Sequence, residues 1–94
     1  MDNFFDFLDA INNLRGEVVG RDTVGDYLVD TCYTADCGWE TAICKNDYWI
    51  VVQRYKTLEE AKTGHNIWRV MCLNEPDGFY SVQYNREMMF KKEN

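Results

Sequence analysis

Apolar residues recur every three or four positions near the start of the chain, at Phe4, Phe7, Leu8, Ile11 and Leu14. This period matches one face of an α-helix, so the pattern predicts a helix over Asp2–Leu14. Its opposite face is polar and carries three acids, Asp2, Asp6 and Asp9. The acidic side is expected either to face water or, as the alternative, to contact a partner.

The pattern then changes to short runs rich in Tyr, Val and Thr, which are separated by Gly, Asn and Asp. Such runs predict strands over Glu17–Arg21, Tyr27–Thr34, Trp39–Lys45 and Tyr48–Tyr55, with a turn over Asp22–Asp26. The last run, YWIVVQRY, is apolar on both faces over most of its length, which is typical of a central strand covered on both sides. We therefore expect a three-stranded antiparallel meander from Tyr27 to Tyr55.

Helical spacing returns after Tyr55. Thr57 and Glu60 form a capping box, T-x-x-E, that predicts the start of a second helix. The face expected to pack on the sheet carries Leu58, Ala61, His65, Trp68 and Cys72, with Gly64 on its flank. Asn74–Gly78 ends this helix, and a last strand over Phe79–Tyr84 is expected to pair at a sheet edge.

These elements predict one domain over residues 1–94. Its class is α+β, with an antiparallel sheet of about four to five strands, an N-terminal helix and a second helix packed on the sheet.

The charge balance limits the kind of partner. The 94 residues include 10 Lys and Arg but 16 Asp and Glu, which gives a net charge of −6. Direct nucleic-acid binding is not expected, because contacts with phosphates need clustered basic side chains. The acidity indicates either a well-solvated surface or a surface complementary to a basic partner.

The expected cellular location of the protein bears on the state of its cysteine thiols. The first residues, MDNFFDFLDA, carry acids where a signal peptide carries Lys or Arg, and no apolar run is long enough to span a membrane. We therefore expect a cytoplasmic protein. In a reducing cytosol its four cysteines are expected to be free thiols or metal ligands rather than disulfides.

Three of the cysteines lie in the stretch TCYTADCGWETAIC, and the chain has a single histidine, His65. Thiolate and imidazole are the ligands that zinc prefers, so Cys37 and His65 are predicted to be the core of a structural zinc site. Cys32 is a third candidate ligand, and Asp36 or Glu40 a fourth. Cys72 lies two helical turns, about 10.5 Å, from His65 and is not expected to share its metal. The alternative is that all four thiols are reduced and no metal binds, with His65 a core residue held by a hydrogen bond.

Part of the chain resembles a group of small, largely uncharacterised proteins of tailed phages and prophages. Their shared pattern is T-x-x-x-x-D-H, then E-T, then R-Y-x-T-x-E-E-A-x-x-G-H. The matching residues here are Thr31, Asp36, Cys37, Glu40-Thr41, Arg54-Tyr55, Thr57, Glu59-Glu60-Ala61 and Gly64-His65. Cys37 stands where many of those proteins have His, and the resemblance thereby implies a metal at Cys37 and His65.

The resemblance, together with small size and acidity, also implies an inhibitor of the anti-CRISPR type. Such a protein blocks an RNA-guided nuclease by occupying basic surfaces that nucleic acid uses. The contact surface is expected to draw on Asp2, Asp6, Asp9, Asp22 and Asp26, and on exposed aromatic residues such as Tyr27, Tyr48 or Tyr80.

Two other functions remain open. The first is a small metalloenzyme using Asp36, Glu40 and His65, although no catalytic constellation is recognisable and an enzyme is not expected. The second is a virion or assembly accessory protein that self-associates through the Phe79–Tyr84 edge and the Met88-Met89-Phe90 patch.

Overall fold

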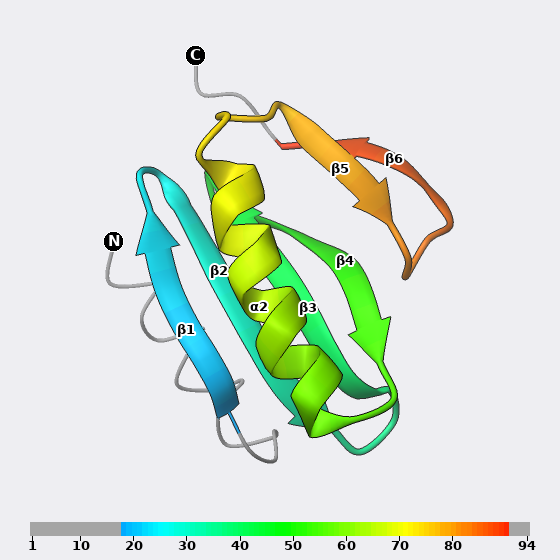
Figure 1. Ribbon diagram of the computed structural model, residues 1–94. Helices are drawn as coiled ribbons and strands as arrows, with labels where there is room; N and C mark the ends of the chain where they lie inside the picture. The colour runs from blue at the N-terminus through cyan, green and yellow to red at the C-terminus, as the bar shows by residue number, and fades with distance from the viewer. Residues whose placement is uncertain (1–17, 91–94) are drawn as a thin grey trace.

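A computed structural model describes residues 18–90, and within this range the chain forms an α+β fold (Figure 1). The elements in order are β1 (Val18–Val24), β2 (Tyr27–Thr34), β3 (Gly38–Lys45), β4 (Tyr48–Tyr55), α2 (Leu58–Cys72), β5 (Gly78–Ser81) and β6 (Arg86–Met89). The expected N-terminal helix, Asp2–Leu14, lies outside the described residues. Within residues 18–90, α2 is the one helix.

The first four strands form an antiparallel sheet in the order of the sequence, β1-β2-β3-β4. The meander predicted for Tyr27–Tyr55 is confirmed, but its last strand, β4, was wrongly predicted to be central and lies at the edge of the sheet. The tight turns of the four-stranded sheet use backbone conformations with positive φ at Gly25 (57°), Gly38 (75°), Asn46 (54°) and Asp47 (63°). Glycine and asparagine adopt this conformation at little cost, so these residues fix where each strand turns back.

The first strand is longer than the sequence pattern predicted. Asp22, Thr23 and Val24 belong to β1 and pair with Val29, Leu28 and Tyr27, instead of forming a turn over Asp22–Asp26. The turn is confined to Gly25 and Asp26. Pairing with the strongly apolar β2 extends β1 beyond what its own polar residues indicate.

Helix α2 covers one face of this sheet and runs roughly along the direction of its strands (Figure 1). The predicted capping box is confirmed, because the Glu60 amide donates to Thr57 Oγ1 at 3.1 Å and Glu60 Oε1 accepts from the Lys56 amide at 3.1 Å. These bonds satisfy donors left open at a helix start. With the start fixed, the helical period turns Ala61, His65 and Cys72 toward the sheet, and all three are buried.

The last strand differs from expectation. The segment predicted as an edge strand of the main sheet instead pairs with β6 in a separate two-stranded sheet, and β6 lies in a stretch for which no element was predicted. Apolar side chains of this hairpin continue the core, since the Phe79 ring packs edge-on against the rings of Trp68, at 5.3 Å, and Phe90, at 5.9 Å. Short strands with mixed composition are stabilised by such packing rather than by their own pattern.

The core between α2 and the sheet is formed by Tyr27, Val29, Ile43, Ile50, Val52, Cys72, Met88 and Phe90. A smaller cluster of Leu28 and Cys44, with Trp49 packed against it, belongs to the other face of the sheet. Within residues 18–90, no helix is long and apolar enough to cross a membrane.

Candidate functional site: a buried hydrogen-bond network at His65

His65 lies in the middle of α2, faces the sheet and is only 5% exposed. Both ring nitrogens have partners. Nδ1 is 2.6 Å from the hydroxyl oxygen of Thr31 on β2, and Nε2 is 2.6 Å from Asp22 Oδ2 on β1. The only histidine of the chain therefore joins the helix to two neighbouring strands.

The polar contacts continue across the sheet. The Thr31 hydroxyl is 2.6 Å from that of Thr41 on β3, which in turn is 2.9 Å from the Tyr55 hydroxyl on β4. Asp22, Thr31, Thr41, Tyr55 and His65, which we call the His65 network, thus take one side chain from each of four strands and one from the helix. Thr31 and Thr41 are fully buried, and a buried polar group costs stability unless it is hydrogen-bonded, so each link matters.

The chemistry of the groups sets the direction of the hydrogen bonds. An ionised carboxylate can only accept, so Nε2–H of His65 donates to Asp22. In the tautomer that carries its proton on Nε2 alone, Nδ1 accepts from Thr31. The Thr31 oxygen then accepts from Thr41, whose oxygen accepts from the Tyr55 hydroxyl. Each of the two threonine hydroxyls in this series is both donor and acceptor, and hydrogen bonds in such ordered chains strengthen one another.

Two glycines give the network its space. A Cβ atom at Gly20 would lie 2.6 Å from His65 Nε2, and one at Gly64 would overlap the Tyr55 ring. Either Cβ atom would lie closer to its neighbour than real contacts allow. Gly20 therefore lets β1 approach the imidazole, and Gly64 lets α2 approach β4 over the tyrosine.

The electrostatics follow from these contacts. The hydrogen bond from His65 lowers the pKa of Asp22 below its usual value of 3.8, against the opposing effect of burial, and the charge of Arg69, 3.8 Å away, acts in the same direction as His65. Burial raises the pKa of Tyr55, and its hydrogen-bond contacts with Thr41 and Trp68 offset part of the rise. Asp22 is thus held as the anion and Tyr55 as the neutral phenol.

The order carboxylate, imidazole, hydroxyl is also that of a hydrolase triad. Here, however, the hydroxyl belongs to Thr31, which is fully buried and already bonded to Thr41. A nucleophile must reach the substrate, and this one cannot. The geometry therefore supports a structural network and no acyl transfer.

The predicted zinc ligands lie in different places. Cys37 and Asp36 are exposed in the turn between β2 and β3, and the Cys37 amide donates to Thr34 Oγ1 at 3.2 Å. Cys32 and Glu40 are each adjacent in sequence to a threonine of the His65 network, so strand alternation directs them to the opposite face of the sheet. Glu40 there pairs with Arg54 at 3.4 Å.

Among residues 18–90, no group of three or more His, Cys, Asp and Glu side chains is placed to hold a metal ion. The residues do not fit a zinc site as they stand, since His65 has no nitrogen without a hydrogen-bond partner. A structural zinc stays a prediction, and no step is derived through it. The other two cysteines are buried, and burial raises the pKa of Cys44 to about 12 and that of Cys72 to about 11.

The predicted partner surface is distributed over several environments. Asp22 belongs to the His65 network and Asp26 is exposed in the turn after β1, whereas Asp2, Asp6 and Asp9 lie outside the described residues. The expectation of an exposed Tyr27 was wrong. Its side chain is 2% exposed and its hydroxyl donates to the Pro76 carbonyl at 2.6 Å. Tyr48 is half-buried, and Tyr80 is exposed.

One surface was missed at the sequence level. Ile67, Val70, Met71 and Leu73, which we call the outer patch of α2, point away from the sheet and are 43–67% exposed. The signal was present, because once His65 and Cys72 are placed inward, the helical period turns Ile67 and Val70 outward.

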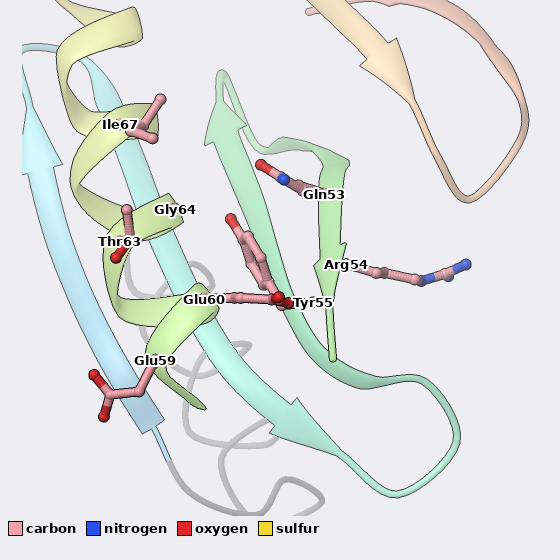
Figure 2. A pocket seen from close by; sticks show the side chains of 8 residues that line it. All are labelled: Gln53, Arg54, Tyr55, Glu59, Glu60, Thr63, Gly64 and Ile67. Carbon is pink, nitrogen blue, oxygen red and sulfur yellow. The ribbon is translucent and has the colours of Figure 1, made fainter. Parts of the chain in front are cut away.

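A shallow groove lies beside this patch, between α2 and β4 (Figure 2). Its volume is about 530 Å³, and its lining includes Gln53, Tyr55, Glu60, Gly64 and Ile67. Tyr55, the last member of the His65 network, therefore also contributes to a surface feature.

Comparisons of this chain with protein-family models, with curated proteins and with solved structures gave no match.

Proposed function

We propose that this chain acts by binding another protein and that the outer patch of α2 is the contact surface. The observation that carries the proposal is the position of four large apolar side chains within seven consecutive residues, all pointing to solvent. The helix does not need them to pack on the sheet, because its inward side already carries Ala61, His65 and Cys72. Contiguous exposed apolar residues on a helix are a common feature of docking faces.

Charge indicates the kind of partner. Acids lie at both ends of the helix, with Glu59 and Glu60 in its first turn and Glu75 and Asp77 after its last. The nearby Arg69 is held within the molecule, at 3.3 Å from Asn66 Oδ1 and 3.8 Å from Asp22. The complementary surface on the partner is therefore an apolar patch bordered by Lys and Arg. A basic partner of this kind also suits the net charge of −6 of this chain.

The finer proposal is an inhibitor of the anti-CRISPR type that a phage produces and that acts in the cytoplasm of the bacterial host. Its partner is then an RNA-guided nuclease, whose basic channels offer the required surface. Small size, acidity and the resemblance to phage proteins support this choice. Binding of this kind requires neither catalysis nor a metal.

The proposal is tested by DNA cleavage with a panel of purified RNA-guided nucleases in the presence of the full chain. We expect inhibition of at least one nuclease, and inhibition weaker at high salt because exposed charges are screened. Val70→Asp and Leu73→Asp each place a charge in the outer patch and should weaken inhibition by about 100-fold or more, the scale of a central apolar contact.

Asn66→Asp is the matched control. It adds the same charge on the exposed side of α2, outside the patch, and an aspartate can still accept from Arg69. This variant should inhibit nearly as well as the wild type. If Val70→Asp and Leu73→Asp fold normally and inhibit as strongly as Asn66→Asp, the outer patch is not the contact surface.

A further inference from the structure

Among residues 18–90, no strand pairs with the outer edge of β4 beside the groove. β4 is the last strand of the four-stranded sheet. Within the described residues, one backbone hydrogen bond from outside the sheet reaches its outer edge, from the amide of Val82 in the β5–β6 turn to the Val51 carbonyl at 2.9 Å. This bond shows that Val51 turns its main-chain groups away from β3. One end of the edge is thus already contacted by the turn that follows β5.

The pairing register of β3 with β4 shows how the main chain is oriented at the other end of this edge. A shift between Thr41 and Ala42 inserts Val52 as an extra residue, after which Gln53, Arg54 and Tyr55 pair with Thr41, Glu40 and Trp39. Main-chain groups of successive residues in a strand point alternately toward and away from the neighbouring strand. Since those of Val51 point away from β3 and Val52 is the extra residue, the main-chain N–H and C=O of Arg54 also point away from β3. The side chains alternate too, so that Gln53 and Tyr55 point toward α2 and Arg54 away (Figure 2).

The groove lies over this open end of the strand. Its α2 side offers a carboxylate at Glu60, a side-chain-free surface at Gly64 and an apolar side chain at Ile67. The one cation in the lining, Arg54, is directed to the other face of the sheet and pairs with Glu40. The groove is therefore acidic at one end and apolar at the other.

We propose that the open edge of β4 binds an extended segment of a partner protein as an added strand, with a basic side chain at Glu60 and an apolar one at Ile67. Side chains of an added strand alternate, so positions i and i+2 of the segment face α2 together. The preferred segment has Lys or Arg two positions from Val or Ile. This deepens the proposed function, and rests on it in taking the occupant to be part of the protein partner.

The test is an NMR titration of the isotope-labelled full chain with a synthetic peptide of alternating lysine and valine. We expect saturable shifts of the Arg54 and Gly64 amide signals. The same peptide with N-methylated main-chain amides keeps its charge but loses strand pairing, and should leave these signals in place. A peptide of alternating glutamate and valine should bind at least tenfold more weakly.

Glu60→Gln sharpens the test, because glutamine still accepts from the Lys56 amide in the capping box but carries no charge. It should weaken binding of the lysine peptide about fivefold to tenfold. Glu87→Gln makes the same change at an exposed position of β6 and is the control. It should leave binding of the lysine peptide unchanged.

Three results would overturn the proposal: equal binding of the N-methylated peptide, equal loss in both glutamine variants, or no saturable shift at Arg54. Concentration-dependent shifts of the same signals without peptide would assign the edge to a second copy instead. The titration uses no nuclease, so its failure is separate from a failure of the inhibition assay.

Discussion

At the scale of single residues, His65 decides how the candidate site is interpreted. A histidine near four cysteines suggests a metal ligand, but here Asp22 and Thr31 occupy both ring nitrogens at 2.6 Å. A ligand histidine must leave one nitrogen to the metal. The contacts therefore assign the imidazole to joining α2, β1 and β2.

Removing a hydroxyl from the network should destabilise the fold. Thr31→Val preserves the shape but leaves His65 Nδ1 and the Thr41 hydroxyl without their partner. We expect the free energy of unfolding to fall by about 1–3 kcal/mol in urea denaturation. Thr41→Val should cost a similar amount, and the double variant less than the sum, because both changes break the same link. Strict additivity would show that the links act independently.

Acid should weaken the Asp22–His65 contact. The pKa of Asp22 is lowered in the fold, so its contribution to stability is present above the usual value of 3.8 and is lost as the pH falls through the lowered pKa. Because the carboxylate is partly exposed, we expect a loss below about 1 kcal/mol between about pH 5 and pH 2.5. Asp22→Asn keeps an acceptor for Nε2–H, so its loss over this range should be smaller. Equal losses in both proteins would contradict the assignment.

At the scale of elements, the close approach of α2 to β4 depends on Gly64. Alanine normally stabilises a helix relative to glycine, by about 0.5–1 kcal/mol. At this position the Cβ would overlap the Tyr55 ring, so Gly64→Ala should instead destabilise by about 1–3 kcal/mol in urea denaturation. Thr63→Ala, one residue earlier on the exposed side, is the control and should be neutral or slightly stabilising. A stabilising Gly64→Ala would show that the tyrosine moves aside easily.

Several residues of the sequence pattern T-x-x-x-x-D-H, E-T and R-Y-x-T-x-E-E-A-x-x-G-H lie where α2 contacts the sheet. Thr31, Thr41, Tyr55 and His65 belong to the network, Glu40 pairs with Arg54, Thr57 and Glu60 cap α2, and Ala61 and Gly64 lie against the sheet. Their spacing in sequence is thus explained by how a helix is fixed across four strands. This interpretation needs no metal at Cys37.

The same elements show how far the sequence allows prediction. The meander and the start of α2 follow from local signals, namely turn residues, alternating strands and the capping box. Two features depend on tertiary contacts and were not predictable locally: the extension of β1 along β2, and the separate pairing of β5 with β6. The contacts of His65 with Thr31 and Asp22 were not predicted, because the pairing register that places these two residues beside it is not visible in spacing alone.

At the scale of the whole molecule, the two sides of α2 have different tasks. Its inner side is fixed to all four strands of the sheet, directly or through the His65 network, whereas its outer patch is apolar and faces solvent. A helix held rigidly in this way presents a preorganised surface, which reduces the entropy lost on binding. Stability and the proposed contact surface are therefore built on opposite sides of one element.

The most direct test of the His65 network is a comparison of zinc content and thermal unfolding for the wild type, Cys37→Ser and His65→Ala, each with and without a chelator. The network predicts that Cys37→Ser and the chelator leave the unfolding midpoint unchanged, because Cys37 is exposed and outside the network. It predicts that His65→Ala alone lowers the free energy of unfolding, by about 2–4 kcal/mol, through lost hydrogen bonds and a cavity. About one zinc ion per wild-type chain, lost in both variants together with stability, would contradict the network and establish His65 as a metal ligand.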